Sequence, residues 1–233
     1  MLKIDHLNVY YGESHILRDV SLEVPPGQVV CLMGRNGVGK TTLLKSIMGL
    51  LPVRRGAISF DGENITAPAS PPNRRAQRGI GYVPQGREIF PQLTVYENLL
   101  IGLQARTDRQ KEVPQAVYEL FPVLKTMLDR RGGDLSGGQQ QQLAIGRALV
   151  SEPRLLLLDE PTEGIQPSII LEIEAVLERI RQTRKTSILL VEQYLQFAQR
   201  LGDSYYIMER GTIVSQGLTQ ELTAEVVRRH LTV

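Results

Sequence analysis

Apolar residues follow two rhythms along this chain, and each predicts a different kind of strand. Near the N-terminus, apolar and polar residues alternate through residues 2–10 and, less regularly, through 15–24, which is typical of half-exposed strands. Further on, short continuous apolar runs predict strands that are buried on both faces, as in parallel sheets. These runs lie at residues 28–33, 80–83, 155–158, 187–191 and 205–208.

Helical periodicity separates these runs. It predicts helices at about residues 40–50, 94–128, 140–150 and 168–184. Residues 66–75 are rich in Pro, Ala, Ser and Arg and predict a surface loop. The predicted fold class is therefore α/β, with a mostly parallel core sheet, an antiparallel β subdomain near the N-terminus and an all-helical insert.

The composition is that of an ordinary globular protein, with 42% hydrophobic residues. Lys+Arg at 27 against Asp+Glu at 25 leave a net charge of +2, which argues against nucleic acid as the main partner. The single cysteine, Cys31, lies in a buried-strand run, so a reducing compartment fits. The N-terminus lacks the layout of a signal peptide, and no apolar run approaches the roughly 20 residues that cross a bilayer. We therefore expect membrane contact only through a partner.

A glycine-rich loop between a predicted buried strand and a predicted helix carries the strongest chemical signal. It fits the pattern G-x-x-x-x-G-K-[S/T] and is followed by a second threonine. Glycines let successive backbone N–H groups point at phosphate oxygens, the lysine supplies a cation, and the threonine hydroxyl can bind Mg²⁺. The predicted nucleotide-binding residues are Gly34, Arg35, Asn36, Gly37, Val38, Gly39, Lys40, Thr41 and Thr42. The pattern by itself would also allow a kinase, a GTPase or another ATPase.

Two acidic residues, Asp159 and Glu160, follow the predicted strand at 155–158. The carboxyl ends of parallel strands open onto the ligand crevice, so we expect both carboxylates near the nucleotide. Asp159 is the candidate Mg²⁺ ligand, and Glu160 is the candidate general base for the attacking water. The alternative is that Glu160 only caps the turn at Pro161.

The run Leu-Ser-Gly-Gly-Gln at 135–139 precedes a predicted helix. By itself it is a loop in which Ser136 caps the helix, although a hydroxyl and glycine N–H groups at a helix start can also bind an anion. The run resembles the signature motif of ATP-binding-cassette (ABC) ATPases, and the order of all motifs agrees over essentially the whole chain. The resemblance implies two cassettes packed head to tail. The ATP on the partner's phosphate loop would then be contacted by Ser136, Gly138 and Gln139. A kinase or a GTPase would have no use for this run, so the run argues against those two classes.

The resemblance assigns roles to further residues. Tyr11 matches the aromatic residue that stacks on adenine; Tyr10 is the alternative register, and a plain strand tyrosine is the other alternative. Gln85 matches the glutamine that contacts Mg²⁺ and water at the hinge into the helical insert. Two positions depart from the family pattern. Gln193 takes the place of the usual histidine near the γ-phosphate, as a catalytic candidate, and Gln166 replaces the usual Asp in the loop after the acidic pair.

The resemblance also implies how the chain is divided. It implies a single ABC ATPase domain over residues 1–233. Residues 1–87 and 149–233 would form the nucleotide-binding core with its N-terminal β subdomain. Residues 88–148 would form the helical signature subdomain.

Gln193 and the run at 162–168 resemble the cassettes of bacterial importers for branched-chain amino acids and for urea. Residues 10–15, 81–90 and 139–142 look most like the urea subgroup. The implied activity is ATP hydrolysis with Mg²⁺ that powers import of urea or, alternatively, of branched-chain amino acids. A soluble ABC ATPase acting in translation or DNA repair is the remaining alternative.

Such a motor implies several partners. They are a second ATPase subunit (a homodimer in isolation or a heterodimer in the complex), two integral-membrane permease subunits and, indirectly, an extracytoplasmic solute-binding protein. The chain would then be cytoplasmic and attached to the inner face of the cell membrane through the permease subunits.

Overall fold

Two β-sheets form the frame of the molecule. The computed structural model describes residues 1–66, 70–223, 226 and 230. The first sheet is antiparallel and has the strand order β2-β1-β4-β5. Its strands are β1 (Leu2–Tyr11), β2 (Ser14–Val24), β4 (Arg55–Phe60) and β5 (Glu63–Asn64). Buried apolar residues alternate with more exposed ones along much of β1, as the N-terminal rhythm predicts.

The second sheet has the strand order β10-β9-β3-β8-β7-β6. Its neighbouring strands are parallel except β9 and β10, which are antiparallel. The strands are β3 (Val29–Met33), β6 (Ile80–Val83), β7 (Leu155–Asp159), β8 (Ser187–Glu192), β9 (Ser204–Glu209) and β10 (Thr212–Leu218). Every residue of β3, β7 and β8 is buried, as expected for continuous apolar runs. The predicted α/β fold class is confirmed.

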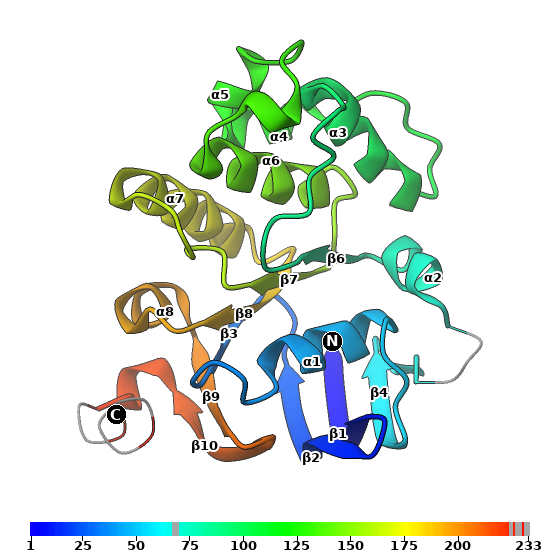
Figure 1. Ribbon diagram of the computed structural model, residues 1–233, viewed down its shortest axis with the longest axis vertical. Coiled ribbons are helices and arrows are strands. Elements are labelled where there is room, and N and C mark those ends of the chain that lie inside the picture. The colour runs from blue at the N-terminus through cyan, green and yellow to red at the C-terminus, as the bar shows by residue number, and fades with distance from the viewer. Residues whose placement is uncertain (67–69, 224–225, 227–229, 231–233) are drawn as a thin grey trace.

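Helices cover both faces of the second sheet, and a further group forms a lobe above it (Figure 1). The lobe contains α3 (Val95–Gly102), α4 (Gln115–Leu120), α5 (Pro122–Lys125) and α6 (Gly137–Leu149), with short 3-10 turns η1 (Leu103–Ala105) and η2 (Gly132–Asp134). The remaining helices are α1 (Lys40–Met48), α2 (Pro72–Gln77), α7 (Pro167–Thr183), α8 (Leu195–Leu201) and the 3-10 turn η3 (Thr219–Glu221).

The side chains of β7 show how the second sheet divides the core. Leu156 and Leu158 pack in a cluster that includes apolar residues of α3, α6, α7 and α8. Leu155 and Leu157 pack in a second cluster, with residues of α1 and the first sheet. Because successive side chains of a strand point to opposite faces, one apolar run contributes to two hydrophobic clusters. The helical lobe therefore shares its core with one face of the second sheet.

The loop predicted for residues 66–75 is partly wrong, because α2 begins at Pro72. Proline is favoured at the first helical position, where the backbone N–H has no partner within the helix. The buried Arg75 guanidinium donates hydrogen bonds to the carbonyls of Ser46 (2.8 Å) and Ile47 (2.7 Å) at the end of α1. These bonds tie α2 to the last turn of α1, where the carbonyls lack a helical N–H partner four residues on. Residues 67–69 of the predicted loop lie outside the described part of the chain.

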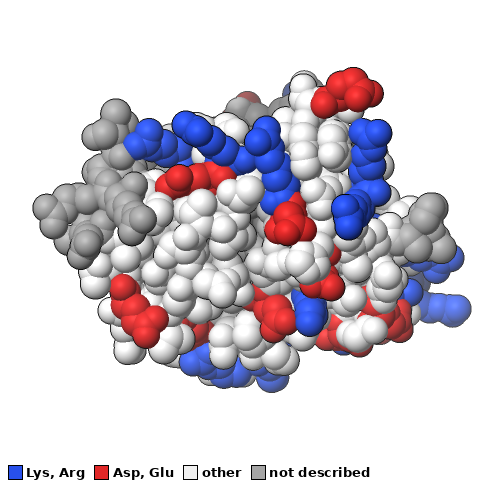
Figure 2. Space-filling model, turned by 90° about the horizontal axis from the view of Figure 1, so that it is seen from below, with Lys and Arg blue, Asp and Glu red and all other residues white. Residues whose placement is uncertain are grey.

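Charge on the surface is mixed. Figure 2 shows the face opposite the helical lobe, where Lys and Arg side chains lie among Asp and Glu side chains and neither sign covers the face. The mixture on this face agrees with the net charge of +2, and the described residues seen there form no broad basic patch of the kind that binds a phosphate backbone. Among the described residues, no helix combines the length and the apolar character needed to cross a membrane.

Candidate nucleotide-binding site

The loop between β3 and α1 has the shape of a phosphate cradle. Gly34 (φ 151°), Gly37 (φ 78°) and Gly39 (φ 117°) adopt left-handed backbone conformations that other residues rarely reach. A Cβ atom on Gly34 would lie 2.4 Å from the Met208 carbonyl oxygen, so the close approach of the two backbones also requires glycine. Gly39 caps α1 without a side-chain hydrogen bond. The first N–H groups of α1 therefore remain for an anion.

Other residues of the loop have structural contacts. Val38 packs against the hydrophobic cluster on the α1 face of the sheet. The buried Thr42 side chain lies in the first turn of α1, and its carbonyl accepts a hydrogen bond from the Ser46 hydroxyl at 2.8 Å. Asn36 accepts a hydrogen bond from the Gln193 amide at 2.5 Å. The loop is thus anchored on both sides of its exposed backbone.

Lys40 lies at the centre of the site and is 4% exposed. Its Nζ donates hydrogen bonds to the carbonyls of Gly34 (2.7 Å) and Arg35 (2.9 Å). It also forms an ion pair with Glu160 Oε1 at 3.2 Å. All three donors of the ammonium group are therefore engaged within the loop and with the candidate base.

Asp159 and Thr41 offer oxygen atoms that fit Mg²⁺. The Thr41 hydroxyl donates a hydrogen bond to Asp159 Oδ1 at 3.2 Å. Asp159 Oδ2 is buried and has no hydrogen-bond partner among the described residues. Burial raises the pKa of Asp159, while the hydrogen bond from Thr41 lowers it. A buried carboxylate oxygen without a partner, beside a hydroxyl, matches the oxygen ligands that Mg²⁺ takes.

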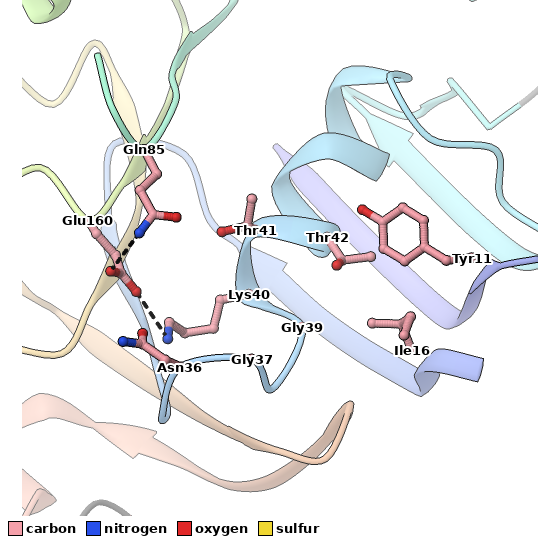
Figure 3. A pocket seen from close by; sticks show the side chains of 10 residues that line it. All are labelled: Tyr11, Ile16, Asn36, Gly37, Gly39, Lys40, Thr41, Thr42, Gln85 and Glu160. Carbon is pink, nitrogen blue, oxygen red and sulfur yellow. Dashed lines mark hydrogen bonds and ion pairs between the residues drawn. The ribbon is translucent and has the colours of Figure 1, made fainter. Parts of the chain in front are cut away.

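Glu160 lies in a network that crosses the site. It follows β7 with a left-handed backbone (φ 48°), so its side chain leaves the strand alternation. Gln193 Nε2 donates to Glu160 Oε1 at 2.8 Å, and Gln85 Nε2 donates to Oε2 at 3.4 Å. Gln85 also donates to Glu163 at 2.9 Å. Figure 3 shows Gln85 and Lys40 reaching Glu160 from opposite sides. The Glu160 carboxylate is thus held beside the phosphate loop. Its side-chain contacts are with Lys40, Gln85 and Gln193, and not with the turn at Pro161 that the alternative interpretation would have it cap.

A pocket joins the phosphate loop to Tyr11, which lies across the first turn of α1 from Glu160 (Figure 3). Tyr11 is 47% exposed, whereas Tyr10 is engaged elsewhere: its ring stacks on His15 with 4.1 Å between ring centroids. Ile16 also lines the pocket. Sequence reasoning missed Ile16, because only the pairing of β1 with β2 brings it near Tyr11. Residues lining this pocket are Tyr11, Ile16, Asn36, Gly37, Gly39, Lys40, Thr41, Thr42, Gln85 and Glu160.

The signature residues lie at a different place, at the start of α6 in the helical lobe. The Ser136 hydroxyl accepts a hydrogen bond from the Gln139 N–H at 3.3 Å, and the Gln139 side chain accepts one from the Ser136 N–H at 3.0 Å. This is a reciprocal capping box. Ser136, Gly138 and Gln139 do not line the pocket at the phosphate loop of their own chain. Gln166 precedes α7 and does not line it either. The contact between chains that the sequence implies stays a prediction.

Comparisons with known proteins agree with this geometry. The chain is 44% identical over 216 residues to the high-affinity branched-chain amino acid transport ATP-binding protein BraG of Pseudomonas aeruginosa, covering 92% of this chain and 91% of BraG. It is 40% identical over 225 residues to the probable branched-chain amino acid transport ATP-binding protein LivF of Archaeoglobus fulgidus, covering 95% and 94%. A solved structure of the ATP-binding subunit of an ABC transporter superposes with a TM-score of 0.79 at 32% identity, covering 98% of this chain and 92% of that one.

The sequence model of the ABC transporter family matches residues 17–163, more than half of the chain. That span includes the phosphate loop, the signature run and the acidic pair. Family and structural neighbours together support ATP hydrolysis with Mg²⁺, which the oxygen atoms of Thr41 and Asp159 fit. The chain therefore belongs to the ABC transporter family, as an ATP-binding protein that hydrolyses ATP.

Proposed function

We propose that this ATPase powers the import of a small solute through a separate membrane permease, and that the solute is a branched-chain amino acid. The resemblance noted in the sequence favours urea, but the likeness to BraG and LivF supports the alternative over urea. The observation that carries the ATPase part is the meeting of Lys40, Glu160 and Gln193 at one point of the phosphate loop. No residue of the site bears on the choice of solute.

The chemistry follows from these contacts. Lys40 and the N–H groups of the loop hold the β- and γ-phosphates, and Tyr11 stacks on the adenine. Thr41, Gln85 and Asp159 would hold Mg²⁺, and the ion would neutralise phosphate charge there. When phosphate oxygens replace Glu160 as the partner of Lys40, the carboxylate becomes able to accept a proton from the attacking water.

In this scheme, Gln193 helps to position the Glu160 carboxylate. Its amide donates to Glu160 Oε1 at 2.8 Å and to Asn36 Oδ1 at 2.5 Å. It therefore connects the candidate base with the phosphate loop by hydrogen bonds. An amide donates these bonds without carrying charge, unlike the protonated histidine it would replace. Gln193 thus fixes the direction of the carboxylate and adds no cation.

The dimer supplies the rest of each site. A helix start that is capped by Ser136, with Gly138 and Gln139 in its first turn, can bind an anion. We propose that these residues contact the ATP on a second ATPase subunit, either a copy of this chain or a related cassette. Two permease subunits bind the pair at the inner face of the membrane, and a solute-binding protein acts through them from outside. Residues 1–87 and 149–233 act as the core, and 88–148 act as the moving signature subdomain.

Uptake measurements test the choice of solute. Deleting the gene should abolish uptake of labelled leucine and leave uptake of labelled urea unchanged, and the Glu160→Gln variant should fail to restore it. Loss of urea uptake alone would reverse the assignment. A chain that stays wholly cytosolic when its permease subunits are co-expressed, with both uptakes intact, would favour a soluble ABC ATPase.

Mixed dimers test the contact between chains. Ser136→Arg places a bulky cation where the proposal puts the partner's ATP. In a dimer that carries Ser136→Arg on one subunit and Lys40→Ala on the other, one site loses both parts and the other keeps both. That dimer should keep about half of the normal turnover, whereas the opposite pairing, with both changes on one subunit, should damage both sites. Equal activity of the two arrangements would contradict an action between chains.

A further inference from the structure

Glu192 is a buried carboxylate at the carboxyl end of β8, directly before Gln193. It is 2% exposed. β8 lies between β3 and β7 in the sheet, and Glu192 pairs in register with Met33, the residue before the phosphate loop. Glu192 therefore lies at the edge of the sheet where the phosphate loop, the acidic pair and Gln193 follow neighbouring strands.

The two oxygens of Glu192 serve two different segments. Oε1 accepts hydrogen bonds from the Thr162 N–H (3.2 Å) and the Thr162 hydroxyl (2.8 Å), which belong to the turn after Glu160. Oε2 accepts from the N–H groups of Gln193 (3.0 Å) and Tyr194 (3.2 Å). Each oxygen thus takes two donors from one segment. The carboxylate joins the turn that follows the candidate base to the turn that carries Gln193.

A buried carboxyl group such as that of Glu192 is better suited to orienting the two turns than to filling space in the core. A carboxylate is costly to bury, and among the described residues no Lys, Arg or His forms an ion pair with Glu192. Burial raises the pKa of Glu192 and outweighs the hydrogen bonds from Thr162, Tyr194 and Gln193, which lower it. The four hydrogen bonds, at 2.8–3.2 Å, satisfy both carboxyl oxygens and tie both turns to one side chain. An apolar residue would fill the space without orienting either turn.

We propose that Glu192 is a positioning residue for ATP hydrolysis, which holds the Gln193 turn against the turn after Glu160 so that the Gln193 amide stays bonded to the Glu160 carboxylate. This inference rests on the roles proposed for Glu160 and Gln193. Glu192 itself touches no reacting atom. Its effect passes through the bond from Gln193 Nε2 to Glu160 Oε1 at 2.8 Å.

The Glu192→Gln variant tests the proposal in the full chain. The shape is kept, but the amide presents N–H groups to one of the two donor pairs, so one turn is released. Steady-state ATP hydrolysis should show kcat reduced about tenfold or more, since a small misplacement of a catalytic group costs up to about a hundredfold. KM for ATP should change by less than about twofold. The control is Ser187→Ala, which removes a buried polar group at the opposite end of β8 that bonds to Pro25 and Gly27. It should lower the thermal midpoint and leave kcat unchanged.

A double-mutant comparison separates positioning from general stability. Gln193→Ala removes the amide but keeps the backbone N–H that Glu192 binds. In that background Glu192→Gln should lower the thermal midpoint as much as before, but should reduce kcat by less than about twofold further. Full multiplication of the two losses in kcat would overturn the role of Glu192 while leaving that of Gln193 intact. Unchanged turnover in Gln193→Ala alone would remove the role of Gln193, and this inference with it.

A second variant covers the case in which Glu192→Gln does not fold. Thr162→Val removes the hydroxyl that donates to Oε1 at 2.8 Å and keeps the charge, the shape and the other bonds. It should reduce kcat about threefold, again with little further effect when it is combined with Gln193→Ala. Normal kcat in a folded Thr162→Val protein would contradict the proposal.

Discussion

The pair formed by Lys40 and Glu160 allows a sharp prediction for the Glu160→Gln variant. In the structure, the Lys40 ammonium group binds the Glu160 carboxylate at 3.2 Å, with both side chains almost fully buried. ATP must replace this carboxylate as the partner of Lys40, and the carboxylate must then face the phosphates. Glu160→Gln keeps the shape and removes the charge. It should therefore slow turnover and strengthen ATP binding at the same time.

The distance sets the scale of both effects. Two unit charges at 3.2 Å attract by about 5 kcal/mol at an effective dielectric constant of about 20, before the cost of removing them from water is subtracted. If about 1.4 kcal/mol of this remains, removing the attraction that the phosphates must displace strengthens ATP binding about tenfold. Turnover should fall by roughly 10²–10⁴-fold, the usual contribution of a general base.

Phosphate release measures turnover, and titration with a fluorescent ATP analogue measures affinity. Glu163→Gln is the matched control, because Glu163 also accepts a hydrogen bond from Gln85 but forms no ion pair with Lys40. The control should stay within about threefold of the normal turnover. Turnover of Glu160→Gln within threefold of normal would remove Glu160 as the base. Weaker ATP binding by this variant would refute the competition between the carboxylate and the phosphates for Lys40.

Three further predictions address the surroundings of the site. Lys40→Ala should weaken ATP binding by about a hundredfold in the same titration, because a charged donor to the phosphates is lost; unchanged affinity would contradict the phosphate cradle. Tyr11→Ala should weaken binding about tenfold through loss of stacking on the base, while Tyr10→Ala, which loses the stack on His15, should mainly lower the thermal midpoint. Burial raises the pKa of the Cys31 thiol, so at pH 8 the native protein should resist iodoacetamide and react only in urea; rapid alkylation of folded protein would show an open site at β3.

Periodicity and motif spacing were enough to predict most of the fold. The runs that became β3, β7 and β8 are apolar at every position because both faces of the strand are covered, so the sequence carries the signal directly. The helix that begins at Pro72 was missed, because six residues are too few to show a helical period. Its stabilising contact is between Arg75 and the distant end of α1, and no local pattern encodes that contact.

The residues of the site also fall into two groups, those that the sequence suggests and those that only the structure shows. The candidate roles of Gly34, Lys40 and Asp159 follow from the sequence alone, because nucleotide binding needs those residue types in that order along the chain. Those of Ile16 and Glu192 do not, since their importance depends on which strands lie side by side. A glutamate before Gln193 looks, in one dimension, like any residue at a strand end. Only the positions of Thr162 and the backbone N–H groups around its oxygens give it a role.

The sheet order explains why such distant segments meet. β3, β8 and β7 are parallel neighbours, so their carboxyl ends reach the same edge and bring the phosphate loop, Gln193 and Glu160 together. Ser136 does not follow any of these three strands. It begins α6, which belongs to the helical lobe above β6 and β7 (Figure 1). A single chain therefore carries a phosphate cradle and a capped helix start as separate features. If both bind one ATP, as the resemblance to ABC ATPases implies, a second subunit must supply the missing half, and the activity should rise with the square of protein concentration while monomers predominate.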